Sequence, residues 1–70
     1  MDAEIKFRNL ELSIHIHNIK AVKEFNDGKF DVYENFTDLL FLDTHYIFVG
    51  DEILCANGKD IEYVLFSSNL

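Results

Sequence analysis

The chain has 70 residues, of which 49% are hydrophobic, with a formal net charge of −7 at pH 7 and a single cysteine. This composition is too apolar for an intrinsically disordered chain, and one cysteine excludes an intramolecular disulfide. Because no apolar run approaches the roughly 20 residues of a membrane-spanning helix and no basic segment leads into one, we expect a single cytoplasmic domain, residues 1–70, without membrane contact.

The first predicted strands lie in residues 5–16. Apolar residues alternate at odd positions at Ile5 and Phe7 and at even positions from Leu10 to Ile16. A bulge or bend near Asn9 would restore the phase. With Ile14 and Ile16 facing inward, the pattern turns Ser13, His15 and His17 outward.

Residues 19–34 follow with an ambiguous pattern. Ile19, Val22 and Phe25 are spaced as on a helix, yet they lead into Asp27-Gly28, a favourable two-residue hairpin turn. We therefore predict a strand. The turn would pair Phe25 with Phe30 and, less favourably, Glu24 with Asp31.

A short helix is predicted around residues 36–42. Asn35 or Thr37 can cap it, Asp38 suits its first turn, and its leucines would contact a sheet. Such a helix is marginal alone, so it must lie on a sheet face.

Residues 45–66 contain two further hairpin signals, Gly50-Asp51 and Asn57-Gly58. Two-residue turns at both would give a three-stranded antiparallel meander. One face of this meander is predicted to be the core and contains Ile47, Val49, Leu54, Ile61, Tyr63 and Leu65. The other is predicted to be an apolar interface with five members: Tyr46, Phe48, Ile53, Val64 and Phe66. The fold class expected is a small, β-rich α+β domain: this meander plus the N-terminal strands in one antiparallel sheet, with the helix at 36–42.

The acidic residues are concentrated in the second half. Residues 1–30 hold five acids and five bases, whereas residues 31–70 hold eight acids and only Lys59. This sign disfavours direct nucleic-acid binding and favours a partner protein with a basic surface. The alternative is that the acids only keep the protein soluble. The predicted acidic interface consists of Asp51, Glu52, Asp60 and Glu62.

The histidines and the cysteine are the remaining candidates for chemistry. His15 and His17 could bind zinc with His45 or Asp43, but paired histidines on a strand also occur as plain surface residues or as a pH switch. We predict no metal or other cofactor and keep His15, His17 and His45 as candidate ligands. Cys55 would face Tyr46 and Asp60, away from His45, so it has no general base and is read as structural. No catalytic constellation is apparent, so the chain is not expected to be an enzyme.

The function expected is that of a small acidic protein that acts by binding another protein. One specific version is an inhibitor that occupies the nucleic-acid groove of an enzyme, as compact acidic proteins of phages and mobile elements do. The alternatives are a homo-oligomeric structural or regulatory module and a small metal-binding protein that uses the His-x-His strand. Because neither a disulfide nor a convincing metal site stabilises so short a chain, we expect a homodimer.

Overall fold

The protein folds into two antiparallel β-sheets. The computed structural model describes residues 1–68. The strands in this range are β1 (Asp2–Phe7), β2 (Ser13–Ile16), β3 (Ala21–Asn26), β4 (Lys29–Tyr33), β5 (His45–Val49), β6 (Ile53–Asn57) and β7 (Ile61–Ser67), with a short 3-10 helix, η1 (Gly58–Asp60), before β7. The predicted α+β class is therefore wrong, since the described residues are nearly all sheet. None of them forms a helix long and apolar enough to span a membrane.

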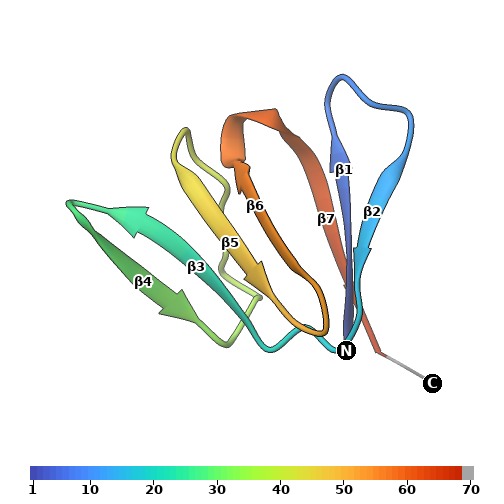
Figure 1. Ribbon diagram of the computed structural model, residues 1–70, viewed down its shortest axis with the longest axis horizontal. Coiled ribbons are helices and arrows are strands. Elements are labelled where there is room, and N and C mark those ends of the chain that lie inside the picture. The colour runs from blue at the N-terminus through green and yellow to red at the C-terminus, as the bar shows by residue number, and fades with distance from the viewer. Residues whose placement is uncertain (69–70) are drawn as a thin grey trace.

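In both sheets some neighbouring strands are not consecutive in the sequence. One has the order β2-β1-β7 and the other β4-β3-β5-β6, as Figure 1 shows; we call them the three-stranded and the four-stranded sheet. The chain first forms β1 and β2 of the three-stranded sheet and then β3 to β6, which make up the four-stranded sheet. It reaches the three-stranded sheet again through η1. The last strand, β7, then pairs with β1 from Asp2–Ser67 to Phe7–Ile61.

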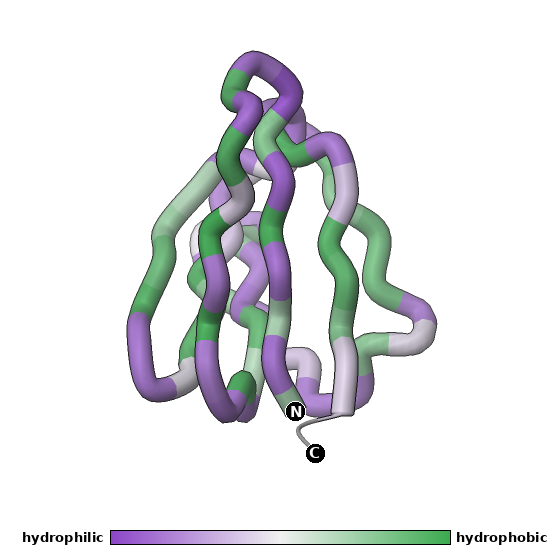
Figure 2. Tube along the Cα trace, turned by 90° about the vertical axis from the view of Figure 1, so that its right-hand side faces the viewer, coloured by the Kyte–Doolittle hydropathy of each residue, from purple (hydrophilic) through white to green (hydrophobic). Residues whose placement is uncertain are grey.

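A single hydrophobic core lies between the sheets. Its fully buried members come from both sheets and their connections: Ala3, Ile5, Ile16, Ile19, Val22, Tyr46, Phe48 and Ile61. Within each strand they occupy alternate positions, because successive side chains of a pleated strand point to opposite faces. Figure 2 shows this alternation of apolar and polar residues along the chain. Full burial of each large side chain contributes about 1.5–3 kcal/mol, so these residues dominate the stability of the fold.

Residues 34–44 form an irregular loop where a helix was predicted. The ring of Phe36 stacks on Phe66 of β7 at 4.5 Å between centroids, and Phe41 packs 5.0 Å from Tyr46 and 5.7 Å from Phe48 of β5. The loop thus contacts both sheets and closes the core. A helix of this length has little intrinsic stability, so these aromatic contacts outweigh it.

The predicted Asp27-Gly28 hairpin is confirmed. It joins β3 to β4 and pairs Phe25 with Phe30 and Glu24 with Asp31. Asp27 has φ 52° and Gly28 φ 80°, which is the double positive φ that this tight turn requires.

The hairpin between β5 and β6 is confirmed, but its register differs by one residue from the prediction. A two-residue turn would pair Val49 with Glu52, whereas the structure pairs Val49 with Ile53. The connection is longer because the Gly50 N–H donates to the carbonyl of Glu52 at 3.0 Å. A slip of one residue moves every side chain of β6 to the opposite face.

No hairpin forms at Asn57-Gly58, so the predicted three-stranded meander is wrong. Asn57 Oδ1 accepts a hydrogen bond from the Lys59 N–H at 3.0 Å and caps η1, which directs β7 to the other sheet. Gly58 is buried, and its N–H donates to the Thr44 carbonyl at 2.9 Å. A side chain at this position would collide with the backbone of Leu42, so the glycine serves close packing here.

The N-terminal phase change marks a chain reversal, so of the two predicted alternatives near Asn9 the bend is confirmed and the bulge within one strand is wrong. β1 and β2 form an antiparallel pair in which Ile5 lies opposite Ile14. The bulge occurs instead between β1 and β7, at Lys6 and Phe7. The strand predicted after residue 19 is confirmed as β3.

The predicted core face is largely wrong. Ile61 is buried and Leu54 packs against the core, but the other four predicted members lie elsewhere. Ile47 and Val49 point away from the core because they alternate with the buried Tyr46 and Phe48. Tyr63 and Leu65 are exposed on the far side of the three-stranded sheet.

Candidate functional site

The predicted apolar interface is not one surface patch. Tyr46 and Phe48 are 0% exposed and form the centre of the core, and Val64 and Phe66 pack against it. Only Ile53 is well exposed, on the opposite side of the four-stranded sheet. Four of the five residues therefore take part in the packing between the two sheets, so an interface must be sought on other residues.

The predicted acidic interface is also divided. Asp51 and Glu52 connect the β5–β6 turn to the segment after β2 through hydrogen bonds. The backbone N–H of His17 donates to Glu52 Oε1 at 2.8 Å, and Asn18 Nδ2 donates to Asp51 Oδ2 at 2.7 Å. The Asp51 N–H in turn donates to the His17 carbonyl at 2.8 Å. These two acids thus take part in connecting the sheets.

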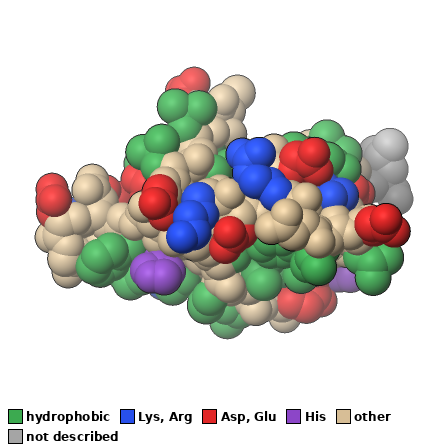
Figure 3. All heavy atoms as spheres, turned by 90° about the horizontal axis from the view of Figure 1, so that it is seen from above, with side chains coloured by type: hydrophobic (Ala, Val, Ile, Leu, Met, Phe, Trp, Pro, Cys, Tyr) green, Lys and Arg blue, Asp and Glu red, His purple; other side chains and the backbone are tan. Residues whose placement is uncertain are grey.

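Asp60 and Glu62 lie at η1 and the start of β7, among basic residues. Lys6 Nζ is 3.2 Å from Glu62 Oε2. Arg8 donates from its backbone N–H to the Asp60 carbonyl and from Nε to the Lys59 carbonyl. Figure 3 looks onto the end of the molecule that is uppermost in Figure 1 and shows lysine and arginine interspersed with acidic side chains. The negative charge of this pair is therefore partly balanced locally.

The three histidines are held apart. His15 Nε2 lies 3.3 Å from Glu4 Oε1, and His17 Nδ1 lies 3.0 Å from Glu52 Oε1. His45 is on β5, opposite Asn57. Within residues 1–68 no three histidine, cysteine or acidic side chains come together as a metal site would require.

The contact between His17 and Glu52 shifts the pKa of both residues. The hydrogen bond to Glu52, and then its negative charge, raise the pKa of His17. The backbone N–H of His17, followed by its ring, lowers the pKa of Glu52.

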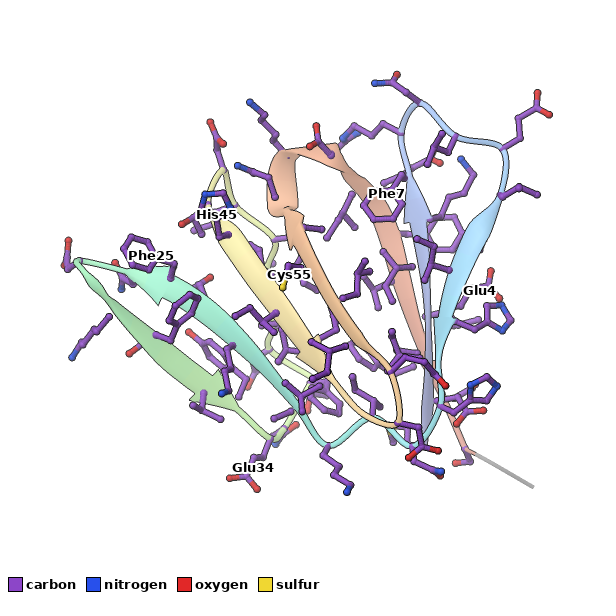
Figure 4. The ribbon with its side chains drawn as sticks, in the orientation of Figure 1. Glu4, Phe7, Phe25, Glu34, His45 and Cys55 are labelled. Atoms are coloured by element: carbon purple, nitrogen blue, oxygen red, sulfur yellow. The ribbon has the colours of Figure 1, made fainter. Side chains whose placement is uncertain are left out.

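An apolar surface lies on the side of the four-stranded sheet that faces away from the core. We call it the outer face, and the strand register arranges it in three rows. The first row is Phe30, Phe25, His45 and Asn57; the second is Val32, Lys23, Ile47 and Cys55; the third is Ala21, Val49 and Ile53. Figure 4 labels Phe25, His45 and Cys55 on three strands of this sheet.

Several side chains of the outer face are open to solvent. Phe25 and Phe30 are 37% and 43% exposed, Val32 is 56% exposed and Ile53 is 69% exposed. The two phenylalanine rings lie edge to face at 5.3 Å and form an aromatic pair at one end of the surface. Cys55 is a free, exposed thiol in the middle row.

The charge of the outer face differs from that of the whole molecule. Although the chain has 13 acidic residues, the rows above contain none of them. Lys23 and His45 are the ionisable nitrogen groups there. The sheet on the other side of the core is different, since Glu4, Lys6 and Ser13 share its outward side with Tyr63 and Leu65.

A second feature is a pair of adjoining acidic hollows between the β3–β4 hairpin and the loop 34–44. They measure about 190 and 350 Å³ and share Glu24 and Leu42. Asp38 borders one hollow, and Asp27 and Asp43 border the other. Lysine, arginine and histidine do not occur among the described residues that line them.

Glu24 is held in these hollows by two tyrosines. The phenolic oxygen of Tyr46 lies 2.6 Å from Glu24 Oε2, and that of Tyr33 lies 3.3 Å from Oε1. Burial, and then the hydrogen bond to Glu24, raise the pKa of Tyr46 to about 12. The negative charge of Glu24, followed by burial, raises the pKa of Tyr33. Both phenols therefore remain neutral donors to the carboxylate at physiological pH.

Three exposed residues of β3 and β4 were not predicted from the sequence as members of a surface, namely Phe25, Phe30 and Val32. The signal for them was present, because the Asp27-Gly28 turn places Phe25 opposite Phe30. The sequence pattern did not indicate which side of this sheet the core covers.

Searches of protein-family models, curated proteins and solved structures find no match to this chain. Its own geometry is therefore the basis for a functional assignment.

Proposed function

We propose that this chain is a non-enzymatic module that binds protein through its outer face. The observation that carries the proposal is the exposed apolar surface of the four-stranded sheet, with Phe25, Phe30, Val32 and Ile53 open to solvent. Contiguous exposed apolar surface in a small protein calls for a partner. Aromatic anchors free of carboxylates are typical of the centre of protein interfaces.

The contrast between the two outward sides supports this choice of surface. Tyr63 and Leu65 on the three-stranded sheet are also exposed, but their neighbours across β1 are Lys6 and Glu4. A polar mixture of that kind is ordinary solvated surface. On the outer face, Val32 and Ile47 are neighbours of Lys23, whose long aliphatic stem can lie along the apolar surface.

Site-specific photo-crosslinking tests the proposal. A photoreactive amino acid is placed at Ile53 on the outer face or, as the matched control, at Leu65 on the three-stranded sheet. The full chain is expressed in cells and the adducts are identified by mass. The proposal predicts discrete protein adducts, with another protein or with a second copy, from position 53 and at least tenfold fewer from position 65. Equal yields from both positions, or none from 53, would reject it.

A basic partner is the second candidate, favoured by the two hollows around Glu24. Their border combines Asp27, Asp38 and Asp43 with leucine side chains, which suits a lysine or arginine side chain with its aliphatic stem. The specific version of this candidate is a phage protein that inhibits an enzyme in the cytoplasm by occupying its nucleic-acid groove. Binding would be steered by charge and would weaken with salt.

NMR with an oligo-lysine peptide tests this second candidate. Amide shifts concentrated at Glu24, Asp38 and Asp43, lost in Asp43→Asn and at high ionic strength, would support it. Shifts of equal size at Glu11, in the β1–β2 turn, would mean that peptide binding depends only on net charge and would rule out this candidate.

A further inference from the structure

We infer that the outer face receives a second copy of this chain, so that two four-stranded sheets pack face to face around a two-fold axis parallel to their strands. This inference rests on the proposed function, because it names the partner of the same surface. Closed two-fold dimers are the commonest homo-oligomers.

The charge distribution selects a second copy as the occupant. Each chain carries a net charge of −7, so two copies repel each other through most of their surfaces. The rows of the outer face contain no carboxylate, and contact there keeps the acids of both copies outside the interface. A strongly basic partner, by contrast, would meet Lys23 in the second row and no opposite charge.

The register of the sheet selects the axis. A two-fold axis parallel to the strands sets β3 of one copy against β5 of the other and keeps each row opposite itself. Lys23 then faces Ile47 of the second copy, and Phe25 faces its His45. An axis across the strands would set Lys23 against the Lys23 of the second copy, which places like charges together. The strand-parallel axis therefore avoids the repulsion.

The size of the surface sets the strength of the dimer. Four strands about 4.8 Å apart and five residues of about 3.3 Å span roughly 19 by 16 Å, or about 300 Å² in projection. Two such faces total about 600 Å² in projection, below the roughly 1,200 Å² at which standard specific interfaces begin, so the contact belongs to the weak, transient class. The dimer should therefore be reversible and depend on concentration. Because two like-charged copies meet, salt should strengthen it.

Sedimentation under reducing conditions tests the inference. Val32→Asp on the outer face is compared with Leu65→Asp, since both residues are exposed and both substitutions add one negative charge. The native chain and Leu65→Asp should dimerise with similar dissociation constants, and Val32→Asp should dimerise at least tenfold more weakly while its circular dichroism and melting stay native. A native chain that remains monomeric at millimolar concentration in high salt, or an equal loss in Leu65→Asp, would overturn the inference.

A thiol-crosslinking test addresses the axis and does not depend on a disruptive variant. The strand-parallel axis sets Val32 opposite Cys55 of the second copy. Within one chain the two positions are three strand spacings apart, about 14 Å, which is beyond the roughly 7 Å between Cα atoms that a disulfide can bridge. Two facing sheets pack about 10 Å apart, which also exceeds the reach of a direct disulfide, so a short bismaleimide crosslinker should join the introduced thiol of Val32→Cys to Cys55 of the second copy and give a covalent dimer. Loss of that dimer in Val32→Cys with Cys55→Ala supports the axis; an undiminished dimer, through two introduced thiols, contradicts it.

The proposed function and the proposed dimer can be overturned separately. A monomer in sedimentation whose position 53 nevertheless crosslinks to a different protein overturns the dimer and leaves the proposed function standing. A monomer without any adduct at position 53 overturns both.

Discussion

Tyr46 places its phenolic oxygen 2.6 Å from Glu24 Oε2, on the neighbouring strand directly opposite it in the register. The same oxygen accepts a hydrogen bond from the Leu42 N–H at 2.8 Å and lies 3.0 Å from the Leu40 carbonyl. One buried hydroxyl thus connects β5, β3 and the loop 34–44. It explains how a segment without regular structure is fixed over the core.

Removal of this hydroxyl should loosen the loop. Tyr46→Phe leaves the Leu42 N–H without its acceptor and removes a donor to Glu24, so we expect a loss of about 1–3 kcal/mol in the free energy of unfolding. Tyr33→Phe, whose hydroxyl makes a longer contact of 3.3 Å with the same carboxylate, should cost less. Urea unfolding of both variants measures the difference, and an equal loss in the two would contradict the central role of Tyr46.

The raised pKa of Tyr46 gives a second test at alkaline pH. Its folded pKa of about 12 lies above the ordinary value of 10, so the unfolded chain loses this proton first. The stabilisation is fully present below pH 10 and is lost as the pH rises toward 12. The free energy of unfolding should fall more steeply in this window for the native chain than for Tyr46→Phe. Parallel curves would show that Tyr46 titrates alike in both states.

The contact between His17 and Glu52 predicts a stability optimum on the acidic side of neutrality. The raised pKa of His17 stabilises the fold below its ordinary value of 6.5 and ceases to do so as the pH rises through the folded value. The lowered pKa of Glu52 stabilises it above the ordinary value of 4.5 and ceases to do so as the pH falls through the folded value. Both contributions are complete between pH 4.5 and 6.5.

Melting temperatures across pH 3–9 measure this effect. The difference between the native chain and Glu52→Gln should be largest between pH 4.5 and 6.5 and shrink on either side. Glu11→Gln, in the β1–β2 turn, is the control and should show no such maximum. A difference that does not change with pH would show that the ionised pair does not support the fold.

Two glycines separate the effects of close packing and backbone conformation. A side chain at Gly58 would collide with the Leu42 backbone and the Tyr46 ring, whereas the space around Gly28 is open and a side chain there meets only the strain of its φ of 80°. Gly58→Asn should therefore destabilise the fold by about 1–3 kcal/mol or more. Gly28→Asn should cost less, about 1 kcal/mol, because asparagine visits the left-handed region more readily than other side chains. Chemical denaturation of the two variants checks this, and the reverse order would refute the packing of η1.

Phenylalanine truncations distinguish the core from the outer face. Phe48 is fully buried and Phe30 is 43% exposed, so Phe48→Ala should cost about 3–5 kcal/mol. Phe30→Ala should cost about 1 kcal/mol, as expected for a half-exposed side chain. Equal costs in calorimetry or urea unfolding would mean that the two faces of the four-stranded sheet have been exchanged.

Local features of the fold could be predicted from the sequence, whereas those that depend on distant contacts could not. The Asp27-Gly28 turn carries its own signal, because the required backbone conformation selects those residues. The register after β5 does not, since its turn makes contacts far along the chain, where Glu52 binds the backbone of His17, 35 residues away. That one-residue difference moved Leu54 to the side of Phe48.

The faces of β5 and β7 were ambiguous for a different reason. Residues 46–49 are apolar at every position, and residues 63–66 are too. Alternation therefore gives no indication of which side of these strands is buried. The loop 34–44 decides it, because Phe41 covers Tyr46 and Phe48. The outer face could be identified only after that cover was known.

Charge along the sequence was also a poor guide to charge in space. The second half holds the acidic excess, but β7 pairs with β1 and so brings Glu62 to Lys6. The predicted acidic quartet is thereby split between two ends of the molecule. The carboxylate-free region follows from strand register and not from position along the chain.

An NMR concentration series tests most directly the claim that the outer face receives a second copy of this chain. Amide spectra of the uniformly labelled native chain are compared from dilute to millimolar concentration in high salt. The account predicts shifts confined to β3, β4, β5 and β6, largest near Lys23, Val32 and Ile47, with β1 and β7 unchanged. Shifts centred on Glu4 and Leu65, or spectra that do not change with concentration, would contradict it.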